Sequence, residues 1–543
     1  MKEGILILDR MKKILIRCCL ALPFFSQTVS AQLSIDGCIG DHMVLQRESP
    51  IPLQGKAAPH STLQITFANV THDLETDAEG NWQTRFPAMA AGGPYELSLH
   101  SGEEKLQFKD ILLGDVWVCA GQSNMAYSLG AQPNLQQVLE NADRPELRYL
   151  ALRVSYADEP QNTKKQNQWI SSTPETAKKM SGVAYHFAAN LQTELGVPIG
   201  IIKASKGGTF IEGWMPEEAF AQNPILQQIP ERWDWLSQNH AQIRSQQEAR
   251  LAQWKPENEA RFKAWADSRE AGPFSPLKPP LPPGGKSLAI PAKIYNSAVH
   301  PATFHPVKGV VWYQGESNSD RGYFYRKLLK QHVQSWRNAW GQPALPFIVI
   351  QLPNYDHTRN PYGPQDGGPW APVRESQAQI LELPHTSLVV TLGLGQDEDV
   401  HPKDKSEVGR RAALSALDRV YEKEILGASP QVTEFEMAPV KVILTFSNTG
   451  EGLSTLDKQA PRGFELAGED KVFHPATAKI IAPNQIQISS AEVPSPVALR
   501  HAWSSAPDFN VVNSAGLPFS TYRTDTWALP NQEQFLPFWW LEL

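Results

Sequence analysis

Ser123 is the first residue whose type and position could do chemistry. It follows the apolar run Val116–Cys119, so it lies on the turn after an expected buried strand. Catalytic groups in open α/β sheets gather at the carboxyl ends of strands, and a serine that opens a helix has its backbone N–H placed to stabilise an oxyanion. A helix N-cap is the common structural alternative. The Gly-x-Ser-x-Gly elbow of α/β-hydrolases is absent, because Met125 occupies its last position.

A serine nucleophile needs a base, and His401 has the most suitable setting among the fourteen histidines. It follows the expected strand Ser387–Leu392, and three acidic side chains precede it within four residues. An imidazole that takes the serine proton is stabilised by a carboxylate that holds its other nitrogen. Without Ser123, a solvated acidic loop would be the better interpretation of this segment.

Two further turns follow apolar runs. The run Gly309–Trp312 leads into Gln314, whose amide could donate to an oxyanion, and Glu316, which could position a histidine. The run Val197–Ile202 leads into Lys203–Thr209, where glycines let a substrate approach and offer backbone N–H groups. Each turn alone is an ordinary strand-to-helix loop. Four such turns after successive strands indicate one site at one edge of a sheet.

The elements that must position these residues form the middle of the chain. Over residues 111–426, apolar runs alternate with longer, more polar, helix-like stretches, which is typical of a parallel sheet covered on both faces. We therefore expect an α/β fold, with a three-layer domain around a central parallel sheet. Residues 217–271 are rich in Glu, Gln, Ala and Arg, and the cluster Pro273–Pro283 follows them. This composition predicts a helical and proline-rich insertion over residues 217–295.

Two β-rich regions flank this domain. Residues 32–110 run in short β-branched and aromatic segments separated by turns, which predicts an N-terminal β-sandwich domain. Residues 427–543 return to alternating apolar segments and predict a C-terminal β-domain.

Residues 1–31 have the pattern of a secretory signal peptide: basic residues, a short apolar run, and the small-residue site Val29–Ala31. The apolar run is far shorter than the roughly 20 residues that a membrane-spanning helix needs. We expect cleavage after Ala31, no membrane attachment afterwards, and a periplasmic or extracellular location.

The composition gives no reason to expect other partners. A formal net charge of −7 over 543 residues provides no electrostatic basis for binding nucleic acid. Only Cys38 and Cys119 follow the signal segment, and we expect both to be buried thiols. No clustered Cys/His spacing indicates a metal site, and the chemistry above requires neither a metal nor a cofactor.

Together these residues resemble the SGNH hydrolase superfamily, and more closely the sialate O-acetylesterase family with its related carbohydrate acetylesterases. The similar blocks are Gly121–Met125, Gly207–Thr209, Trp312–Asn318, and His401-Pro402 with Lys405. Outside the site, the similar segments are Met43–Arg47, Gly80–Trp82, Ala502-Trp503, Pro507, Asn513, and Gly516 through Asp525. The resemblance therefore extends over nearly the whole chain after the signal segment.

The resemblance implies that Ser123 is the nucleophile and His401 the general base. It implies an oxyanion hole made by Gln314, the Ser123 N–H, and the N–H of Gly207 or Gly208. The orienting acid is left open, because the family's usual position, three residues before the histidine, holds Glu398. We expect Asp399 first, with Glu316 and Glu398 as competitors or partners.

The activity implied is that of a secreted serine esterase that removes O-acetyl groups from sugars through an acyl-enzyme, with a sialate O-acetylesterase as the first expectation. Asn124, Asn318 and Arg359 are expected to contact the O-acetylated carbohydrate. The motifs surround the acetyl group and not the alcohol, so an acetylxylan or other polysaccharide acetylesterase stays open. A non-catalytic carbohydrate-binding protein on an inactive scaffold is the alternative of another class.

Overall fold

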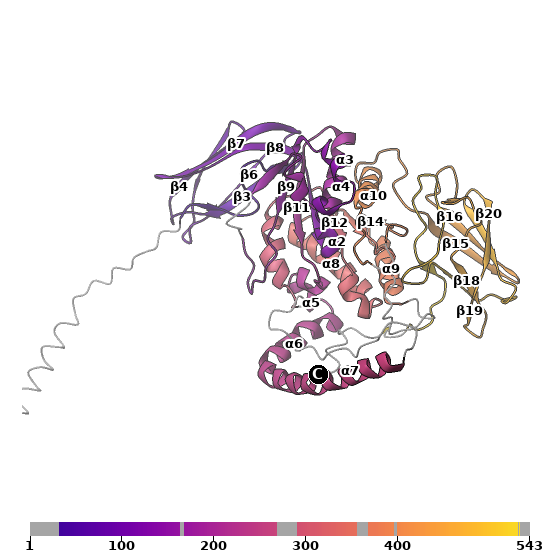
Figure 1. Ribbon diagram of the computed structural model, residues 1–543. Coiled ribbons are helices and arrows are strands. Elements are labelled where there is room, and N and C mark those ends of the chain that lie inside the picture. Colours follow the sequence, from indigo (N-terminus) through magenta and orange to yellow (C-terminus); the bar gives the residue numbers. More distant parts are fainter. Residues whose placement is uncertain are drawn as a thin grey trace, which may run out of the picture.

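The computed structural model describes residues 32–162, 168–268, 290–355, 368–395, 399–529 and 532. It shows a mixed α/β protein with several sheets (Figure 1), as expected for the fold class. The expected signal segment, the proline cluster Pro273–Pro283, Glu398 and Arg359 lie outside the described residues. Among the described helices, none is long and apolar enough to cross a membrane.

The centre of the molecule is a sheet in the strand order β10-β9-β11-β8-β12-β13-β14. Its strands are β8 (Glu104–Gly121), β9 (Arg144–Ala151), β10 (Trp169–Ser172), β11 (Ile199–Ser205), β12 (Gly309–Tyr313), β13 (Phe347–Ile350) and β14 (Thr386–Val389). All of these pairings are parallel except that of β10 with β9. The buried apolar runs of β12 and β13 are typical of strands covered on both faces.

Helices pack on both faces of this sheet. Gly309 is the register partner of Trp117, so Trp312, three residues further along β12, points to the opposite face from Trp117. On one face Trp117 contacts Phe187 of α4 (Gly182–Leu195), and α4 packs against α10 (Ser406–Arg419). On the other face Trp312 contacts Trp336 of α8 (Tyr325–Trp340). Local signals define α4, with Ser181 as a bonded N-cap and Gly196 as a left-handed C-cap.

The N-terminal region shares a strand with this sheet. The first part of β8 pairs with β2 (Val44–Gln46) and β7 (Gly92–Ser101), while β4 (Thr62–Phe67) and β5 (Val70–Glu75) extend that side. A second sheet contains β1 (Ser34–Ile35), β3 (Ile51–Lys56) and β6 (Asn81–Phe86). The boundary expected after residue 110 falls inside β8, at Asp110, whose φ of 55° interrupts the regular strand. One hydrophobic cluster therefore runs through both regions.

Arg47 connects the N-terminal region to the amino-terminal side of the central sheet. Its Nε and Nη2 donate to the two carboxylate oxygens of the fully buried Asp115, each at 3.0 Å. The Tyr421 hydroxyl donates to the same carboxylate at 3.0 Å. A paired charge thus holds β8 where it enters the central sheet, while Ser123 follows the carboxyl end of the strand.

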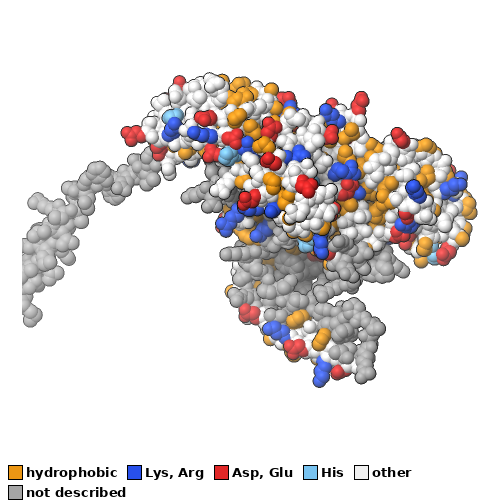
Figure 2. Space-filling model, turned by 45° about the horizontal axis from the view of Figure 1, so that its top comes forward, with side chains coloured by type: hydrophobic (Ala, Val, Ile, Leu, Met, Phe, Trp, Pro, Cys, Tyr) orange, Lys and Arg blue, Asp and Glu red, His pale blue; other side chains and the backbone are white. Residues whose placement is uncertain are grey.

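The C-terminal region has its own hydrophobic cluster. One four-stranded antiparallel sheet contains β15 (Gln431–Ala438), β16 (Lys441–Ser447), β21 (Gln485–Ser489) and β20 (Thr477–Ala482). Another contains β19 (Phe473–Pro475), β18 (Phe464–Ala467), β22 (Ala498–His501) and β24 (Tyr522–Arg523), and β17 (Ser454–Thr455) pairs with β23 (Val511–Val512). On the face shown in Figure 2, acidic and basic side chains are interspersed over the coloured surface.

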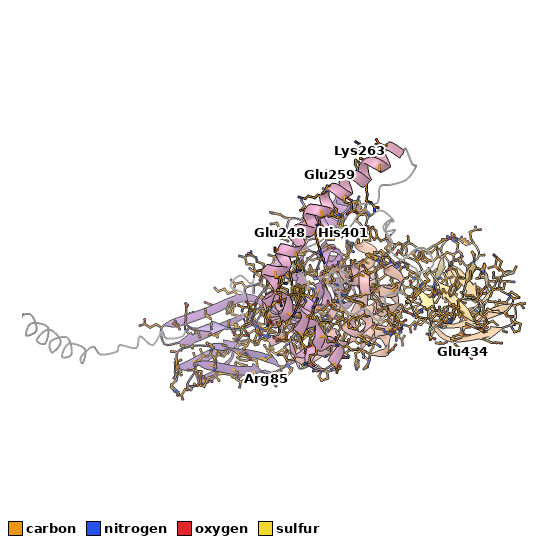
Figure 3. All side chains as sticks on the ribbon, turned by 90° about the horizontal axis from the view of Figure 1, so that it is seen from below. Arg85, Glu248, Glu259, Lys263, His401 and Glu434 are labelled. Carbon is orange, nitrogen blue, oxygen red and sulfur yellow. The ribbon has the colours of Figure 1, made fainter. Side chains whose placement is uncertain are left out.

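Helices α5 (Glu218–Ala221), α6 (Pro224–Gln238) and α7 (His240–Ser268) lie within the expected insertion. In Figure 1 they lie below the ends of β8 and β12. Figure 3 looks from that end, with α7 crossing in front of the rest of the molecule and His401 labelled. Two tryptophans of the insertion differ in their exposure to solvent, since Trp233 is buried whereas Trp235 is 40% exposed.

Outside the insertion, the expectation that Cys38 and Cys119 are buried free thiols is confirmed.

Candidate active site

Three of the expected turns begin at the same level of the sheet. Ser123 opens the short helix α2 (Ser123–Ala126) directly after β8. In the parallel register, Gly121 at the end of β8 is level with Ser205 of β11 and with Tyr313 of β12. The second and third turns therefore begin on either side of the Ser123 turn, as parallel strands with aligned carboxyl ends require.

Glycines let these turns approach one another. Gly121 has a φ of 143°, and a Cβ there would lie 2.0 Å from the Tyr313 carbonyl oxygen, so no other residue fits without displacing β12. A Cβ on the exposed Gly207 would lie 3.4 Å from the Ser123 Cβ, which puts the second turn directly beside the serine. Within the described residues, no loop hydrogen bond uses the N–H groups of Ser123, Gly207 or Gly208. These N–H groups are available to an oxyanion.

His401 lies on the same rim as Ser123. The side chain of Asn124, next to the serine, donates to the carbonyl oxygen of Val400, next to the histidine, at 3.0 Å. The His401 ring lies 6.4 Å from the Tyr127 ring, measured between centroids. The turns that carry these two residues, 278 positions apart in the chain, are thus joined by a contact between the residues' immediate neighbours.

Among the carboxylates that the structure describes, Asp399 lies within ion-pair distance of His401. Its Oδ1 lies 3.5 Å from His401 Nδ1 and accepts the His401 backbone N–H at 2.9 Å. Both side chains are partly exposed, at 35% for His401 and 39% for Asp399. The backbone bond holds the carboxylate against the ring, in a position to orient the imidazole.

Glu316 reaches the site through Asn124 instead of the histidine. Its Oε1 accepts from Asn124 Nδ2 at 2.6 Å, while its Oε2 is buried without a hydrogen-bond partner in the described part of the chain. Burial raises the pKa of this carboxyl, although the Asn124 hydrogen bond and the nearby Lys405 oppose the shift. Glu316 therefore places a carboxyl group against the Asn124 amide, next to the Ser123 turn.

The comparisons with known proteins agree on one family. The family model described as "Carbohydrate esterase, sialic acid-specific acetylesterase" matches residues 113–243 and 283–417. Sialate O-acetylesterases of Mus musculus and Homo sapiens are each 24% identical over 512 residues, which cover 86% of this chain and 89% and 87% of those proteins. A crystal structure of a novel carbohydrate acetylesterase from Xanthomonas citri is 32% identical with a TM-score of 0.76, covering 91% of this chain and all of that one. This chain belongs to the sialic acid-specific acetylesterase family of carbohydrate esterases.

Membership makes the protein a carboxylic ester hydrolase that acts in sugar deacetylation. The predicted resemblance is confirmed, and the alternative of a non-catalytic binding protein is not supported. Within this esterase family, the geometry of the individual side chains decides which of the expected roles are open to them.

Three amides of the esterase for which we expect roles at the site are bonded to other protein groups. Gln314 is fully buried, and its amide donates one hydrogen to the Thr209 carbonyl oxygen at 3.1 Å and the other to Asn318 Oδ1 at 2.8 Å. Neither hydrogen is left for an oxyanion. Asn318 is also fully buried and donates to Glu212 at 3.1 Å. Asn124 is fully buried too. The amides of both asparagines are thus bonded to other groups of the protein, as is usual for buried polar groups.

Lys405 is a site residue of the esterase whose position the sequence did not reveal. It is fully buried, and its Nζ donates to Asn124 Oδ1 at 2.7 Å. Its ammonium lies 5.0 Å from the Tyr127 ring centroid and 5.9 Å from that of Tyr313. Burial lowers the pKa of Lys405 to about 7. The place of Lys405 in the histidine block indicated a role at the site, but the spacing of residues along the chain does not show whether a side chain is buried.

A buried ion pair beneath the second and third turns was also missed. Glu212 Oε1 lies 2.7 Å from Arg321 Nη1, with both side chains at most 2% exposed. Through Asn318, this pair is connected to Gln314 and so holds the two turns together. Among the residues that the structure describes, no group of three or more His, Cys, Asp and Glu could hold a metal ion.

Proposed function

We propose that this enzyme is an exported serine O-acetylesterase of the SGNH type. Ser123 Oγ attacks the acetyl carbonyl while His401 takes its proton, and His401 then returns that proton to the departing sugar hydroxyl. Water then hydrolyses the acetyl-enzyme. The observation that carries this proposal is the bond between Asn124 and Val400, which joins the Ser123 and His401 turns.

The oxyanion hole is proposed to consist of backbone groups. In the part of the chain that the structure describes, no loop hydrogen bond uses the N–H of Ser123 or that of Gly207 or Gly208, and these groups lie on adjacent turns. Preorganised N–H groups of this kind stabilise the charge that develops on the carbonyl oxygen. Gln314 acts indirectly, because its amide bonds the second turn to the third.

The acid of the triad is proposed to be Asp399. It lies within ion-pair distance of His401 Nδ1, whereas Glu316 is bonded to Asn124. Glu398 stays a competitor, since it lies just before Asp399 in the chain and outside the described residues.

The proposed architecture is a three-layer SGNH domain over residues 111–426, with the insertion at 217–295. A signal peptide over residues 1–31 and an N-terminal β-domain over 32–110 precede it, and a C-terminal β-domain over 427–543 follows it. Helices on both faces of the central sheet and the separate C-terminal cluster support this division.

The proposed substrate is an O-acetylated sialic acid, because the curated relatives are sialate O-acetylesterases. Such a sugar carries a carboxylate, which an arginine or lysine recognises. Lys206 is half-buried in the second turn, and its backbone N–H bonds the Gly121 carbonyl oxygen at 3.1 Å, close to the nucleophile turn. On a sialate substrate, Lys206→Met should raise KM, while KM for acetylated xylan should not change. Faster acetate release from acetyl-xylan by the parent enzyme would favour the polysaccharide alternative.

The catalytic assignment is tested with Ser123→Ala. We expect kcat on p-nitrophenyl acetate to fall by at least about 10³-fold, because the nucleophile is removed, while circular dichroism shows an unchanged fold. Ser319→Ala, on the third turn, is the matched control and should keep the parent rate. A parent rate in Ser123→Ala would overturn the assignment.

A further inference from the structure

The amide of Asn124 is held by three groups from three different segments. Its Nδ2 donates to Glu316 Oε1 on the third turn and to the Val400 carbonyl oxygen beside His401. Its Oδ1 accepts from Lys405 Nζ, one residue before helix α10. Every hydrogen-bonding atom of this buried amide is therefore used to fix the residue that follows Ser123.

We propose that Lys405 is a positioning residue for catalysis, whose ammonium group orients the Asn124 amide and thereby holds the Ser123 turn against the His401 turn. This inference rests on the proposed roles of Ser123 and His401. It adds a residue that acts through Asn124 and does not itself contact the substrate.

The donor and acceptor chemistry of the partners supports this role. A carbonyl oxygen only accepts hydrogen bonds, so Val400 can bond only Nδ2 of Asn124, and Glu316 Oε1 lies against the same nitrogen. An ammonium group only donates, so Lys405 can bond only Oδ1. The three partners together permit one orientation of the amide. A 180° flip would face Lys405 with an N–H and leave Glu316 and Val400 facing an oxygen.

The energetic setting of Lys405 also indicates a role beyond stability. No carboxylate oxygen of the described residues lies within ion-pair distance of its fully buried ammonium, and burying a charge without a close counter-ion costs free energy. Costs of this kind are retained where function requires them. A methionine would fill similar space without that cost.

Protonation controls whether Lys405 can enforce this orientation. A neutral amine can accept as well as donate, so loss of the proton removes the contribution of Lys405 to this constraint, while the Val400 carbonyl oxygen still accepts from Nδ2. Burial lowers the pKa of Lys405 to about 7, so the change falls near neutral pH. The surrounding groups are the carboxylates of Glu316, Asp399 and Asp404, the rings of Tyr127, Tyr313 and His401, and His186 of α4 beyond Gln132.

The test compares Lys405→Met and Lys405→Arg with the control Lys403→Met, which changes an exposed lysine two residues away. For each full-length variant, kcat and KM on p-nitrophenyl acetate are measured from pH 6 to pH 9. We expect Lys405→Met to lose about 10- to 100-fold in kcat with little change in KM, since small misplacement of a nucleophile has effects of this size. Lys403→Met should match the parent.

The pH profile separates positioning from a purely structural role. The parent should lose kcat on the alkaline side with a midpoint near pH 7, as Lys405 loses its proton. Lys405→Arg keeps a donor that does not titrate in this range, so its alkaline midpoint should move up by at least about one pH unit. If the alkaline midpoint of the kcat profile were the same in Lys405→Arg as in the parent, the inference would be overturned. This outcome decides the question even if Lys405→Met does not fold.

A double-mutant cycle tests the route through Asn124. If Lys405 acts through that amide, adding Lys405→Met to Asn124→Ala should cost less than about twofold further, which is strong non-additivity. Fully additive losses would contradict the route. Activity in Ser123→Ala would refute the proposed function itself. An inactive Ser123→Ala together with parent-like Lys405 variants would refute only this inference.

Discussion

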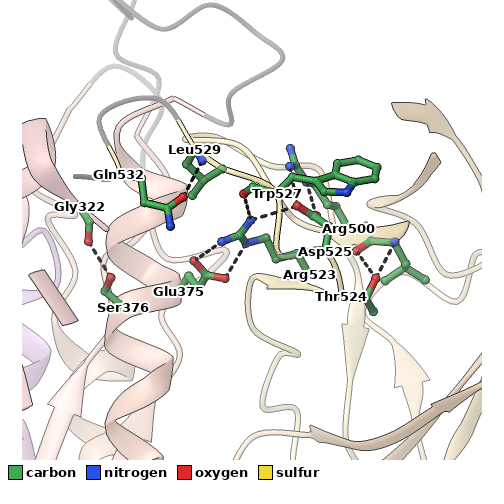
Figure 4. Close-up of polar contacts among 11 residues, drawn as sticks. Gly322, Glu375, Ser376, Arg500, Arg523, Thr524, Asp525, Trp527, Leu529 and Gln532 are labelled. Carbon is green, nitrogen blue, oxygen red and sulfur yellow. Dashed lines mark hydrogen bonds and ion pairs between the residues drawn. The ribbon is translucent and has the colours of Figure 1, made fainter. Parts of the chain in front are cut away.

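Two networks of buried charge in this esterase are built in opposite ways. At the active site, Lys405 and Glu316 both contact Asn124 but form no ion pair with each other. Between the central and C-terminal regions, Arg523 of β24 forms two hydrogen bonds to Glu375 of α9 (Trp370–Ala378), at 2.7 and 3.3 Å. Asp525 joins this second network by accepting from Arg523 at 3.0 Å and from Arg500 at 3.0 and 3.2 Å (Figure 4).

The pKa values move in opposite directions in the two networks. For Arg523, burial favours the neutral form, but its bonds with Glu375 and its charge interactions raise the pKa overall. For Lys405, burial prevails and lowers the pKa. The Arg523 network therefore joins two regions through paired charges, while Lys405 lies beside Asn124, next to the proposed nucleophile, without an ion-pair partner among the described residues. We expect the first network to serve stability and the second to serve chemistry.

Removing the centre of the site network should have the largest effect. Asn124→Ala takes away both donors and the acceptor, so we expect kcat to fall by about 10³-fold. The free energy of unfolding should fall by about 2–3 kcal/mol, because buried charged groups lose their hydrogen bonds. Steady-state kinetics and urea unfolding measure the two losses. Asn134→Ala, at an exposed position whose side chain forms no cap bond, is the control. A variant that kept a tenth of the parent kcat would contradict this view of the network.

Substitution of Asp399 and substitution of Glu316, the two described candidates for the acid, should lower kcat by different factors. Asp399→Asn is expected to lower kcat by about 10²- to 10³-fold, because the imidazole loses the carboxylate that orients it. Glu316→Gln keeps an oxygen that accepts from Asn124, so a loss of about tenfold is expected. Parallel kinetics at one pH compare the two variants. A larger loss for Glu316→Gln would move the acid role to the third turn.

The interregion network should affect stability without affecting chemistry. Arg523→Met leaves Glu375 and Asp525 without a shared partner, and breaking a buried pair of this kind costs about 3 kcal/mol. We expect a lower urea midpoint and an unchanged kcat. Arg462→Met is the matched control, since Arg462 pairs with Asp508 on the exposed surface of the same region and such pairs contribute little. If folded Arg523→Met lost kcat, the view that this network serves stability and the Asn124 network serves catalysis would be wrong.

The pH dependence of stability should show the smallest effect. The pKa of Lys405 falls from 10.5 to about 7 on folding, so the folded state binds fewer protons between these values. Stability of the parent relative to Lys405→Met should therefore rise as the pH increases from 7 to 9, by about 2 kcal/mol. Thermal unfolding of both proteins at several pH values measures this. The difference in stability between the parent and Arg523→Met should show no such trend, since both keep Lys405, and a fall in the stability of the parent relative to Lys405→Met with rising pH would contradict the sign.

The strands that carry the site were predictable because their sequences are continuous and apolar. Val116–Cys119, Gly309–Trp312 and Phe347–Ile350 all fall inside strands of the central sheet. β9 was missed, because Arg144, Glu146 and Arg148 interrupt its apolar residues. The passage of β8 through residue 110 was missed as well, since the polar first part of the strand belongs to a different sheet from its apolar end.

The sequence by itself determined the family and the turns on which Ser123, Gly207 and His401 stand, because motifs and strand ends are local properties of the chain. Only the tertiary structure decided what the polar side chains on those turns do. An amide such as that of Gln314 or Asn124 has the same donors and acceptor whether it faces a substrate or the interior. Whether such an amide faces a substrate or the interior depends on its partners from distant segments. Packing brings these partners together, and the spacing of residues along the chain does not reveal them.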